Sequence, residues 1–372
     1  MANITERNGK YRIRISIYDN TGKQHFRSKT YSPKVGMTKK QIKKEVNRVA
    51  VLFEEEIKNS NFSFNIDKSF KSFMEEWFKT YAELTLKKIT IGGYRERSKK
   101  LYEMLGDKKL EELNPLVIQK FVGDLTSEGL SPKSVKNYVR LVSNVLNYAV
   151  RKQVIPFNPC TTVDYPREVK KEKVMFSVEE VKKFLSLLND ESSSVEVFFI
   201  LLIYTGARKS EILALAWEDI DFENGLISIN KSYVYSSYYK ESFEDTTKTV
   251  ASTRVLKISK VPMDSLEKLK EWHNNLSINS KYIFVNRNGE ILHASTPNHF
   301  LSRICKKHGF KKVNVHSFRH FAASAMISTG VDVVSVQSAL GHSTPATTLN
   351  IYSHAFKNAS EKASDAIVKV LE

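Results

Sequence analysis

Four polar side chains near the C-terminal end of the chain could together act on a phosphodiester. His316 and Arg319 are three residues apart, and His342 and Tyr352 follow, so all four fall within 37 residues. A tyrosine hydroxyl has a reference pKa of about 10, so it becomes a useful nucleophile only beside a proton acceptor. An arginine stays charged and can donate two hydrogen bonds to one phosphate. We therefore consider Tyr352 as a nucleophile toward a phosphodiester that the other three residues hold and activate.

Taken singly, each of these residues has an ordinary explanation. A His-x-x-Arg pair on a helix is most often a surface pair, and an isolated tyrosine usually belongs to a core or an interface. We expect His320 and His354, which lie in the same stretch, to be structural. The cluster therefore needs support from the elements that would position it.

The elements around the cluster are predicted to be helices. A helix beginning at His316 would place His316 and Arg319 on one face and would be closed by Gly330. A second helix over 333–340 ends at Gly341, a residue favoured just beyond a helix end. This would leave His342 outside the helix, where its ring can turn toward a site.

Upstream, the unit that begins near residue 176 has clear start and core signals. Ser177 followed by Glu180 is a capping box. The apolar stretch 195–204 predicts a central buried helix that ends at Thr205-Gly206. Strands are expected over 226–230 and 254–259, with a long polar segment between them.

The composition favours a polyanionic partner. Lysine and arginine exceed aspartate and glutamate by 17 residues, and the sequence pI is about 9.5. Nucleic acid is the commonest partner for such a charge. Two cysteines are too few for a disulfide framework or a zinc cluster and fit a reducing compartment. The N-terminus has no apolar run, and no stretch approaches 18 apolar residues, so neither a signal peptide nor a membrane span is expected.

The N-terminal stretch predicts a small sheet backed by one helix. Apolar and polar residues alternate from Tyr11 to Tyr18, a turn signal follows, and a second strand is expected over 23–31. A helix over 38–58 carries apolar residues on one face. A strand pair with basic outward residues can lie in a major groove. The candidate DNA contacts here are Arg12, Arg14, Arg27 and Lys29.

The next unit, over residues 64–155, reads as four or five helices with basic surfaces. Asn114-Pro115 and Ser131-Pro132 are helix-start signals. The second of these helices has an apolar stripe, and its basic residues lie off that stripe. They are the candidate DNA contacts of this unit: Lys133, Lys136 and Arg140. A charged, proline-punctuated stretch then predicts a linker.

Four fragments of the sequence, taken in order, resemble the motifs of the tyrosine recombinase (phage integrase) family. The segment 205–211, which contains Arg208, resembles the first arginine motif. The segment 316–320 resembles the His-x-x-Arg motif. Leu340-Gly341-His342-Ser343 followed by Tyr352 resembles the final motif, and Lys248 resembles the lysine of the family's strand hairpin. The whole chain is similar to integrases of temperate phages and conjugative transposons.

The resemblance implies a multidomain, mainly α fold with small β-sheets. It divides the chain into an arm-DNA-binding-like domain of strands plus a helix (1–60), an all-helical core-binding domain (61–166), a linker (167–175) and a mixed α+β catalytic domain with a tail helix (176–372). The implied activity is site-specific DNA strand exchange through a 3′-phosphotyrosine and a Holliday junction.

The resemblance also assigns roles at the site. Arg208 and Arg319 would neutralise the phosphate, and His342 would donate a third hydrogen bond. His316 would accept the proton of Tyr352. Lys248 would protonate the departing 5′ oxygen, and Glu211 would orient Arg208 or His316. No metal or cofactor is required, because the arginines supply the positive charge.

The implied partners are double-stranded DNA attachment sites, a homo-tetramer on DNA, and accessory excision or bending proteins. The expected place of action is the nucleoid of a bacterial cytoplasm, without a membrane. The amphipathic tail 358–372 is expected to dock on a neighbouring subunit, with docking on its own domain as the alternative.

Three other functions stay open from the sequence. A type IB topoisomerase shares the phosphotyrosine chemistry but needs no N-terminal arm-like unit. A non-catalytic DNA-binding regulator could lose the tyrosine and the lysine, yet both are present. A metal nuclease would use His316, His320 and His342, but no carboxylate cluster accompanies them.

Overall fold

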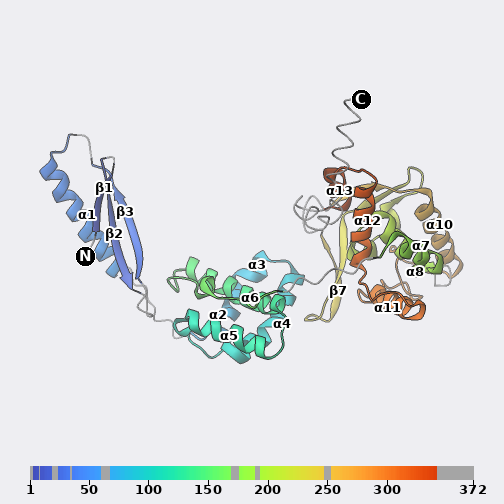
Figure 1. Cartoon of the computed structure of the whole chain (residues 1–372), viewed down its shortest axis with the longest axis horizontal. Helices are drawn as coiled ribbons and strands as arrows, with labels where there is room; N and C mark the ends of the chain where they lie inside the picture. Colours follow the sequence, from blue (N-terminus) through green and yellow to red (C-terminus); the bar gives the residue numbers. More distant parts are fainter. Residues whose placement is uncertain are drawn as a thin grey trace. The chain divides into compact units, whose positions relative to one another are not determined.

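The computed structural model describes residues 3–7, 9–18, 24–33, 36–59, 68–168, 176–188, 193–246 and 253–341. The chain divides into two compact units, Met1–Lys170 and Lys171–Glu372. Their secondary structure is mainly helical with small antiparallel sheets (Figure 1), as the sequence predicted.

The N-terminal part of the first unit is a three-stranded sheet covered on one face by a helix. The strands are β1 (Asn3–Arg7), β2 (Lys10–Tyr18) and β3 (Gln24–Tyr31), paired in the order β1-β2-β3, and the helix is α1 (Lys39–Asn59). Figure 1 shows α1 running along the sheet. Strand β1 was not predicted: Asn-Ile-Thr-Glu-Arg has one apolar residue and no alternation, and its pairing with β2 makes it a strand.

Beyond residue 68, the first unit is a helical bundle with a core of its own. The helices are α2 (Phe70–Trp77), which continues through a π-helical turn (Phe78–Ala82) into α3 (Glu83–Thr85), then α4 (Lys88–Leu105), α5 (Pro115–Ser127) and α6 (Pro132–Arg151). The predicted starts of α5 and α6 are confirmed, because Asn114 and Ser131 accept hydrogen bonds from first-turn N–H groups. The stripe of α6 is fully buried: Val135, Val139, Val142, Leu146 and Ala149.

The second unit packs seven helices of the described residues around small sheets. The helices are α7 (Val178–Leu188), α8 (Ser193–Thr205), α9 (Lys209–Leu213), α10 (Lys260–Asn275), α11 (Thr296–His308), α12 (His316–Ser328) and α13 (Val333–Leu340). One antiparallel sheet has the order β4-β5-β8, formed by β4 (Ile220–Asp221), β5 (Leu226–Ile229) and β8 (Arg254–Lys257). The predicted capping box holds: the Ser177 N–H donates to Glu180, and the Glu180 N–H donates to Ser177.

A hairpin occupies part of the segment that the residue pattern showed only as a polar connection, although the resemblance places Lys248 on a strand hairpin. Its strands are β6 (Lys231–Ser236) and β7 (Glu241–Thr246), which pair with each other. Five of the six residues of β6 are half-buried, so neither side of the strand is clearly inside. Without an inside and an outside, the sequence has no apolar alternation to reveal a strand.

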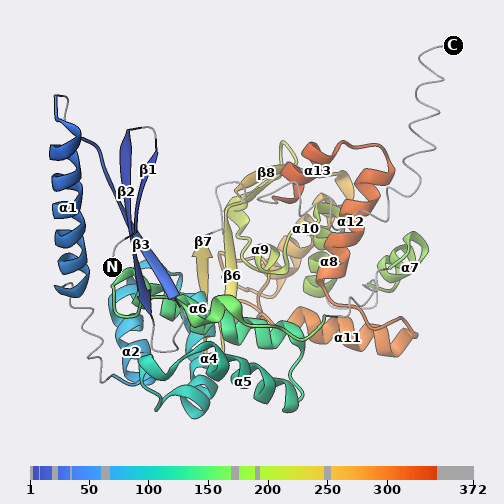
Figure 2. The ribbon, with the colours of Figure 1, turned by 60° about the vertical axis from the view of Figure 1, so that its left-hand side comes forward.

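Helix α8 lies at the centre of the second unit and packs against α10 and α12 (Figure 2). Its apolar side chains other than Tyr204 are buried on all sides, in line with the predicted central helix. Because α12 packs directly on α8, the backbone that carries the His-x-x-Arg pair is held against this central helix. None of the helices in the described ranges is long and apolar enough to span a lipid bilayer.

Candidate active site

The site begins at the turn that ends α8. The Thr205 hydroxyl donates to the Leu201 carbonyl, and the Ala207 N–H donates back to that hydroxyl, which closes the helix. Gly206 then takes a left-handed conformation, with φ of +61°. A Cβ at this glycine would lie 2.6 Å from Leu340 Cδ2 of α13 and 3.1 Å from Ala322 Cβ of α12. The turn is therefore the point where α8, α12 and α13 meet.

Arg208 follows this turn and links three parts of the unit. Its Nη1 lies 2.6 Å from Glu211 Oε1, and its backbone N–H donates to Glu211 Oε2 at 2.9 Å. Its Nη2 donates to the carbonyl of Gly341, 133 residues later in the chain, at 3.0 Å. The Arg208 side chain is still 30% exposed. The guanidinium is thus held in one orientation and keeps an edge toward solvent.

Arg319 reaches the same turn from α12. Its Nη1 donates to the Gly206 carbonyl at 2.9 Å, across 113 residues of sequence. The preceding Phe318 anchors α12, because its ring packs 5.0 Å from Phe184 and 5.3 Å from Phe176. Arg319 itself is 2% exposed. The structure thereby brings Arg319 to the turn that Arg208 follows.

The two histidines of α12 differ in exposure. His316 is the first residue of the helix and is exposed, whereas His320 is buried. Their rings meet edge to face, with centroids 4.8 Å apart. The first turn is capped by Asn314, whose Oδ1 accepts a hydrogen bond from the Ser317 N–H at 3.1 Å. His316 therefore lies at the surface, while His320 packs in the interior against the His316 ring.

Glu211 contacts a further arginine that sequence reasoning missed. Arg254, the first residue of β8, lies 3.0 Å from Glu211 Oε2 through its Nη2 and donates from Nε to the Ala339 carbonyl at 2.7 Å. The Arg254 and Glu211 side chains are 7% and 3% exposed. Arg254 stands two residues after Ser252 in the stretch that follows Lys248, and its charge in a predicted strand was the available signal.

The two arginines keep Glu211 ionised. Burial alone would raise the pKa of this carboxyl, but the charges of Arg254 and Arg208 and the Arg208 N–H outweigh it, so the pKa lies below its ordinary value. A charged Glu211 can hold both guanidiniums at once. Glu211 thus contacts Arg208, the residue that it is predicted to orient.

Three predicted catalytic residues lie outside the described residues: Lys248, His342 and Tyr352. His354, the predicted linker beyond residue 168 and the predicted tail helix lie outside them as well. The described residues nearest to them in the chain belong to β8 and to the end of α13. Strand β8 begins six residues after Lys248, and Gly341, the residue before His342, is held by Arg208. Gly341 ends α13, as predicted, and takes a left-handed conformation there.

The predicted DNA contacts of the sheet are divided between its two faces. Arg12 pairs with Thr30 and Arg14 with Ser28, so both arginines lie on the face opposite α1. Arg27 and Lys29 pair with the buried Ile15 and Ile13, which puts them on the helix side. Consistently, the Lys29 ammonium lies 5.4 Å from the Phe53 ring of α1.

The open face of the sheet carries two further basic residues that sequence reasoning missed. Arg7 of β1 pairs with Lys10 of β2, and both share the face of Arg12 and Arg14. All four are exposed. The signal was hidden because β1 was not recognised as a strand. A continuous basic face therefore lies opposite α1.

The basic residues of the helical bundle share one side of α6. Lys133, Lys136 and Arg140 are spaced by three and four residues, which aligns them on a helix surface. Lys136 lies 3.8 Å from Glu168, and both side chains are about half exposed. Lys133 and Arg140 are exposed.

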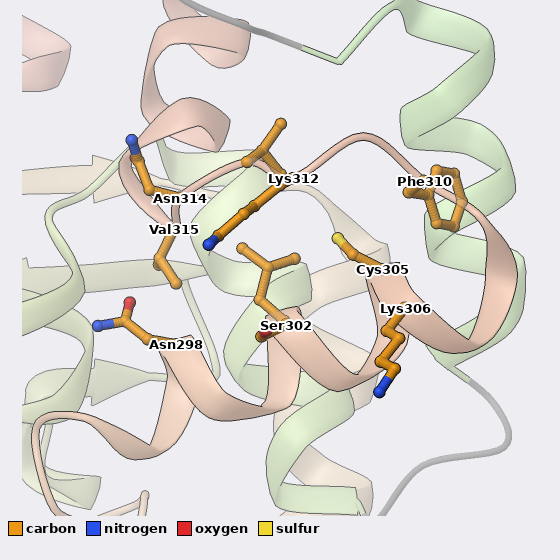
Figure 3. A pocket seen from close by; sticks show the side chains of 10 residues that line it. Asn298, Ser302, Cys305, Lys306, Phe310, Lys312, Asn314 and Val315 are labelled. Atoms are coloured by element: carbon orange, nitrogen blue, oxygen red, sulfur yellow. The ribbon is translucent and has the colours of Figure 1, made fainter.

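A pocket of about 420 Å³ lies beside the start of α12, between α11 and the segment that joins the two helices (Figure 3). Cys305 of α11 and Lys312 of the joining segment line it, together with the ring of Phe310. Its lining includes neither of the two arginines of the site. Across the described ranges, no group of three or more His, Cys, Asp or Glu side chains is placed to hold a metal ion.

The fold and these motifs define a class of protein: a helical domain followed by a catalytic domain with two arginines converging on one turn. Residues 69–165 match the phage integrase SAM-like domain, and residues 175–359 match the phage integrase family. The ICEBs1 integrase of Bacillus subtilis (strain 168) is 30% identical over 276 residues, which covers 70% of this chain and 72% of that protein. The chain belongs to the phage integrase family and is a tyrosine recombinase, an enzyme that cuts and rejoins DNA.

Other relatives cover 81% to 97% of this chain. A XerC-like tyrosine recombinase of Caldanaerobacter subterraneus subsp. tengcongensis is 27% identical over 97% of this chain and 98% of its own length. The Tn1549 transposon integrase, solved in complex with a circular intermediate DNA, superposes with a TM-score of 0.72 at 19% identity, over 81% of this chain and 100% of that one. A lambda integrase dimer bound to a COC′ core site gives a TM-score of 0.58 at 18% identity, over 94% of each chain. These two likenesses show the shared fold.

Proposed function

We propose that this recombinase integrates or excises a mobile element by attack of Tyr352 on a DNA phosphodiester. The single observation that carries the proposal is the convergence of Arg208, Arg319 and Gly341 on one turn. Arg208 follows the Gly206 turn and holds the carbonyl of Gly341, the residue that precedes His342, while Arg319 binds the carbonyl of Gly206 itself. A phosphate bound at this place would have two permanent cations beside it.

In this mechanism, the cations offset the charge that develops on the non-bridging oxygens. Arg208 and Arg319 donate to those oxygens, and His342 donates a third hydrogen bond. His316 accepts the Tyr352 proton as the phenolic oxygen bonds to phosphorus. Lys248 gives a proton to the departing 5′ oxygen. These five residues and the tyrosine are the proposed catalytic set.

The product of this step is a 3′-phosphotyrosine and a free 5′ hydroxyl. Because the phosphotyrosine conserves the ester bond, a 5′ hydroxyl from another duplex can displace Tyr352 and rejoin the strand without ATP. A reciprocal pair of such exchanges, one strand from each duplex, makes a Holliday junction, and a second pair resolves it. The reaction needs neither a metal nor a cofactor, since the arginines supply the charge.

The three parts of the chain would share the binding of DNA. We propose that the open face of the N-terminal sheet contacts arm-type sites and that α6, through Lys133, Lys136 and Arg140, contacts the core site beside the catalytic unit. Both surfaces carry basic side chains that are exposed to solvent, where they could bind DNA phosphates. The boundaries 1–60, 61–166 and 176–372 are proposed as the limits of these three domains.

The proposed assembly is a homo-tetramer on two duplexes. A lambda integrase tetramer bound to a Holliday junction has the same fold, with a TM-score of 0.58 at 19% identity. Four copies of this chain would provide the four tyrosines that two pairs of strand exchanges require. Accessory excision or bending proteins would set the direction, and the bacterial nucleoid is the proposed place of action.

A nicked suicide duplex that contains the attachment site tests the proposal. The wild type should accumulate a covalent adduct with DNA in the presence of EDTA. Tyr352→Phe should form no adduct yet bind the duplex with nearly the same Kd, because only the hydroxyl is lost. Tyr204→Phe removes the hydroxyl of an exposed tyrosine on α8 and should behave as the wild type.

The alternatives give other results in the same assay. An adduct with Tyr352→Phe would reject the assignment of the nucleophile. Cleavage that disappears in EDTA would indicate a metal nuclease. Relaxation of a supercoiled plasmid that lacks attachment sites, at the rate seen with them, would favour a type IB topoisomerase.

A further inference from the structure

We infer that Arg254 is a positioning residue of this active site, which acts through Glu211 on Arg208 and through Ala339 on the end of α13. The inference rests on the proposed function, because it concerns the residue that holds a phosphate-binding arginine. Arg254 lies at the start of β8, six residues after Lys248, and is not among the predicted catalytic residues.

The first support is a continuous chain of contacts. Arg254 Nη2 lies 3.0 Å from Glu211 Oε2, and the other oxygen of the same carboxylate, Oε1, lies 2.6 Å from Arg208 Nη1. One carboxylate thus bridges the two guanidiniums. Any rotation of Glu211 would move the partner that fixes Arg208.

The second support is that both arginines hold the same end of α13. Arg254 Nε donates to the Ala339 carbonyl at 2.7 Å, and Arg208 Nη2 donates to the Gly341 carbonyl at 3.0 Å. The residue between these two carbonyls, Leu340, is fully buried. The last turn of α13, from which the chain continues to His342, is therefore clamped at two points.

The third support is the rigidity of the place where Arg254 stands. Its Cα pairs with that of Ile229 in β5, a residue that is 1% exposed in the core. The side chain is itself 7% exposed. An arginine fixed by a sheet register and by burial can set the position of Glu211, rather than follow it.

The geometry needs an arginine rather than any cation. Nε and Nη2 of one planar guanidinium point to two different acceptors, a carboxylate and a carbonyl. A lysine has one nitrogen on a flexible stem and cannot place two donors in that fixed relation. Arg254→Lys keeps the positive charge near Glu211 but loses one of the two contacts. It therefore tests positioning while it limits the cost of an unpaired buried carboxylate.

The test measures adduct formation at two kinds of scissile linkage. One suicide duplex has the natural phosphodiester, and the other has a methylphosphonate there, as the mixture of both stereoisomers. The methylphosphonate lacks the negative charge, so its cleavage depends less on a well-oriented Arg208. We expect Arg254→Lys to slow adduct formation by about 10- to 100-fold on the phosphodiester, the range for a lost orienting partner or a misplaced group. On the methylphosphonate, the loss should be at least several-fold smaller.

The ratio of the adduct-formation rates on the two substrates does not depend on the fraction of folded protein, since both rates are measured on the same protein. Arg254→Gln, which loses the charge as well, should slow adduct formation on the phosphodiester more than Arg254→Lys does. Its loss on the methylphosphonate should again be the smaller of the two. Arg287→Lys changes an exposed arginine of a turn in the same unit and should leave both rates unchanged. Duplex Kd should stay within about twofold for all three variants.

Equal losses on the two substrates, or no loss with Arg254→Lys, would overturn the inference and leave the proposed function intact. Absence of adduct with the wild type on the phosphodiester would instead overturn the proposed function, and this inference would fall with it.

Discussion

At the scale of single residues, Gly206 is the point on which the site depends most directly. Its φ is +61°, and a Cβ would overlap Leu340. We expect Gly206→Ala to lower the free energy of unfolding of the catalytic unit by about 1–2 kcal/mol from the backbone and by about 1–3 kcal/mol more from overpacking. Adduct formation should fall further than stability does, because the Arg319 and Arg208 contacts both start from this turn. Urea unfolding and suicide-duplex yields measure the two effects.

Gly309 offers a matched control for this substitution. It also has positive φ, at +71°, and a Cβ there meets nothing within 4 Å. Gly309→Ala should therefore show the backbone cost alone and leave adduct formation unchanged. Equal effects of the two substitutions would contradict the role of close packing at Gly206.

The catalytic unit also contains a histidine that should make its stability sensitive to acid. His273 of α10 is 2% exposed, and its ring lies edge to face with Trp217 at 5.5 Å. Neither ring nitrogen has a hydrogen-bond partner among the described residues. Burial lowers the pKa of this histidine. The folded state therefore disfavours the charged ring.

The lowered pKa of His273 determines how the free energy of unfolding changes with pH. As the pH falls below about 6.5, the unfolded chain takes up a proton at residue 273 before the folded chain does, so stability falls by up to about 1.4 kcal/mol per pH unit. Between pH 7.5 and pH 5.5, we expect the stability of His273→Phe to fall less than that of the wild type, because the variant lacks the contribution of His273. Urea unfolding at the two pH values, with Trp217 and Trp272 as fluorescent probes, measures it. The same pH dependence in both proteins would show that His273 does not contribute.

At the scale of elements, the two faces of the N-terminal sheet allow a prediction of which basic residues bind DNA. Arg12 and Arg14 lie on the open face, whereas Arg27 and Lys29 lie on the side of α1. We expect Arg12→Gln with Arg14→Gln to weaken binding to an arm-type duplex and to lower the salt slope, log Kd against log salt, by about 0.9 for each lost phosphate contact. Arg27→Gln with Lys29→Gln removes the same charge and serves as the control. An equal loss from both pairs would mean that net charge, and not the face, decides binding.

The elements that the sequence predicted well are those with local signals. The caps at Asn114, Ser131 and Ser177 depend on residues three positions away, so they can be read directly from the chain. The residue pattern did not reveal strands β1, β6 and β7, because they are ordered by their neighbours and have no buried face of their own. Local pattern does not report pairing across a sheet.

The same distinction applies to the site. Arg208 and Arg319 were predicted because they stand in motifs. Arg254 was not, because its importance comes from Glu211 and Ala339, which lie 43 and 85 residues away. Such contacts exist only after folding. Sequence alone named the groups proposed to touch the phosphate, but not the one that we propose positions them.

At the scale of the whole molecule, the described residues form two large hydrophobic cores that are separate from each other. The cluster of the helical bundle begins at Phe70, and that of the catalytic unit begins at Phe176. Neither contains a residue from the N-terminal sheet or from α1. The sheet is therefore expected to contribute to DNA binding and not to the stability of the rest.

Removal of residues 1–60 tests this division. The shortened chain should unfold at the same midpoint in urea, followed by the fluorescence of Trp77, Trp217 and Trp272, because both cores remain complete. Its adduct yield on a core-site suicide duplex should be close to that of the full chain. Binding to a duplex with arm-type sites should fall to the level of non-specific DNA, since the open basic face is gone and the link between two kinds of site is lost. A lower urea midpoint, or a loss of adduct on the core site alone, would show that the first 60 residues support the fold or the chemistry as well.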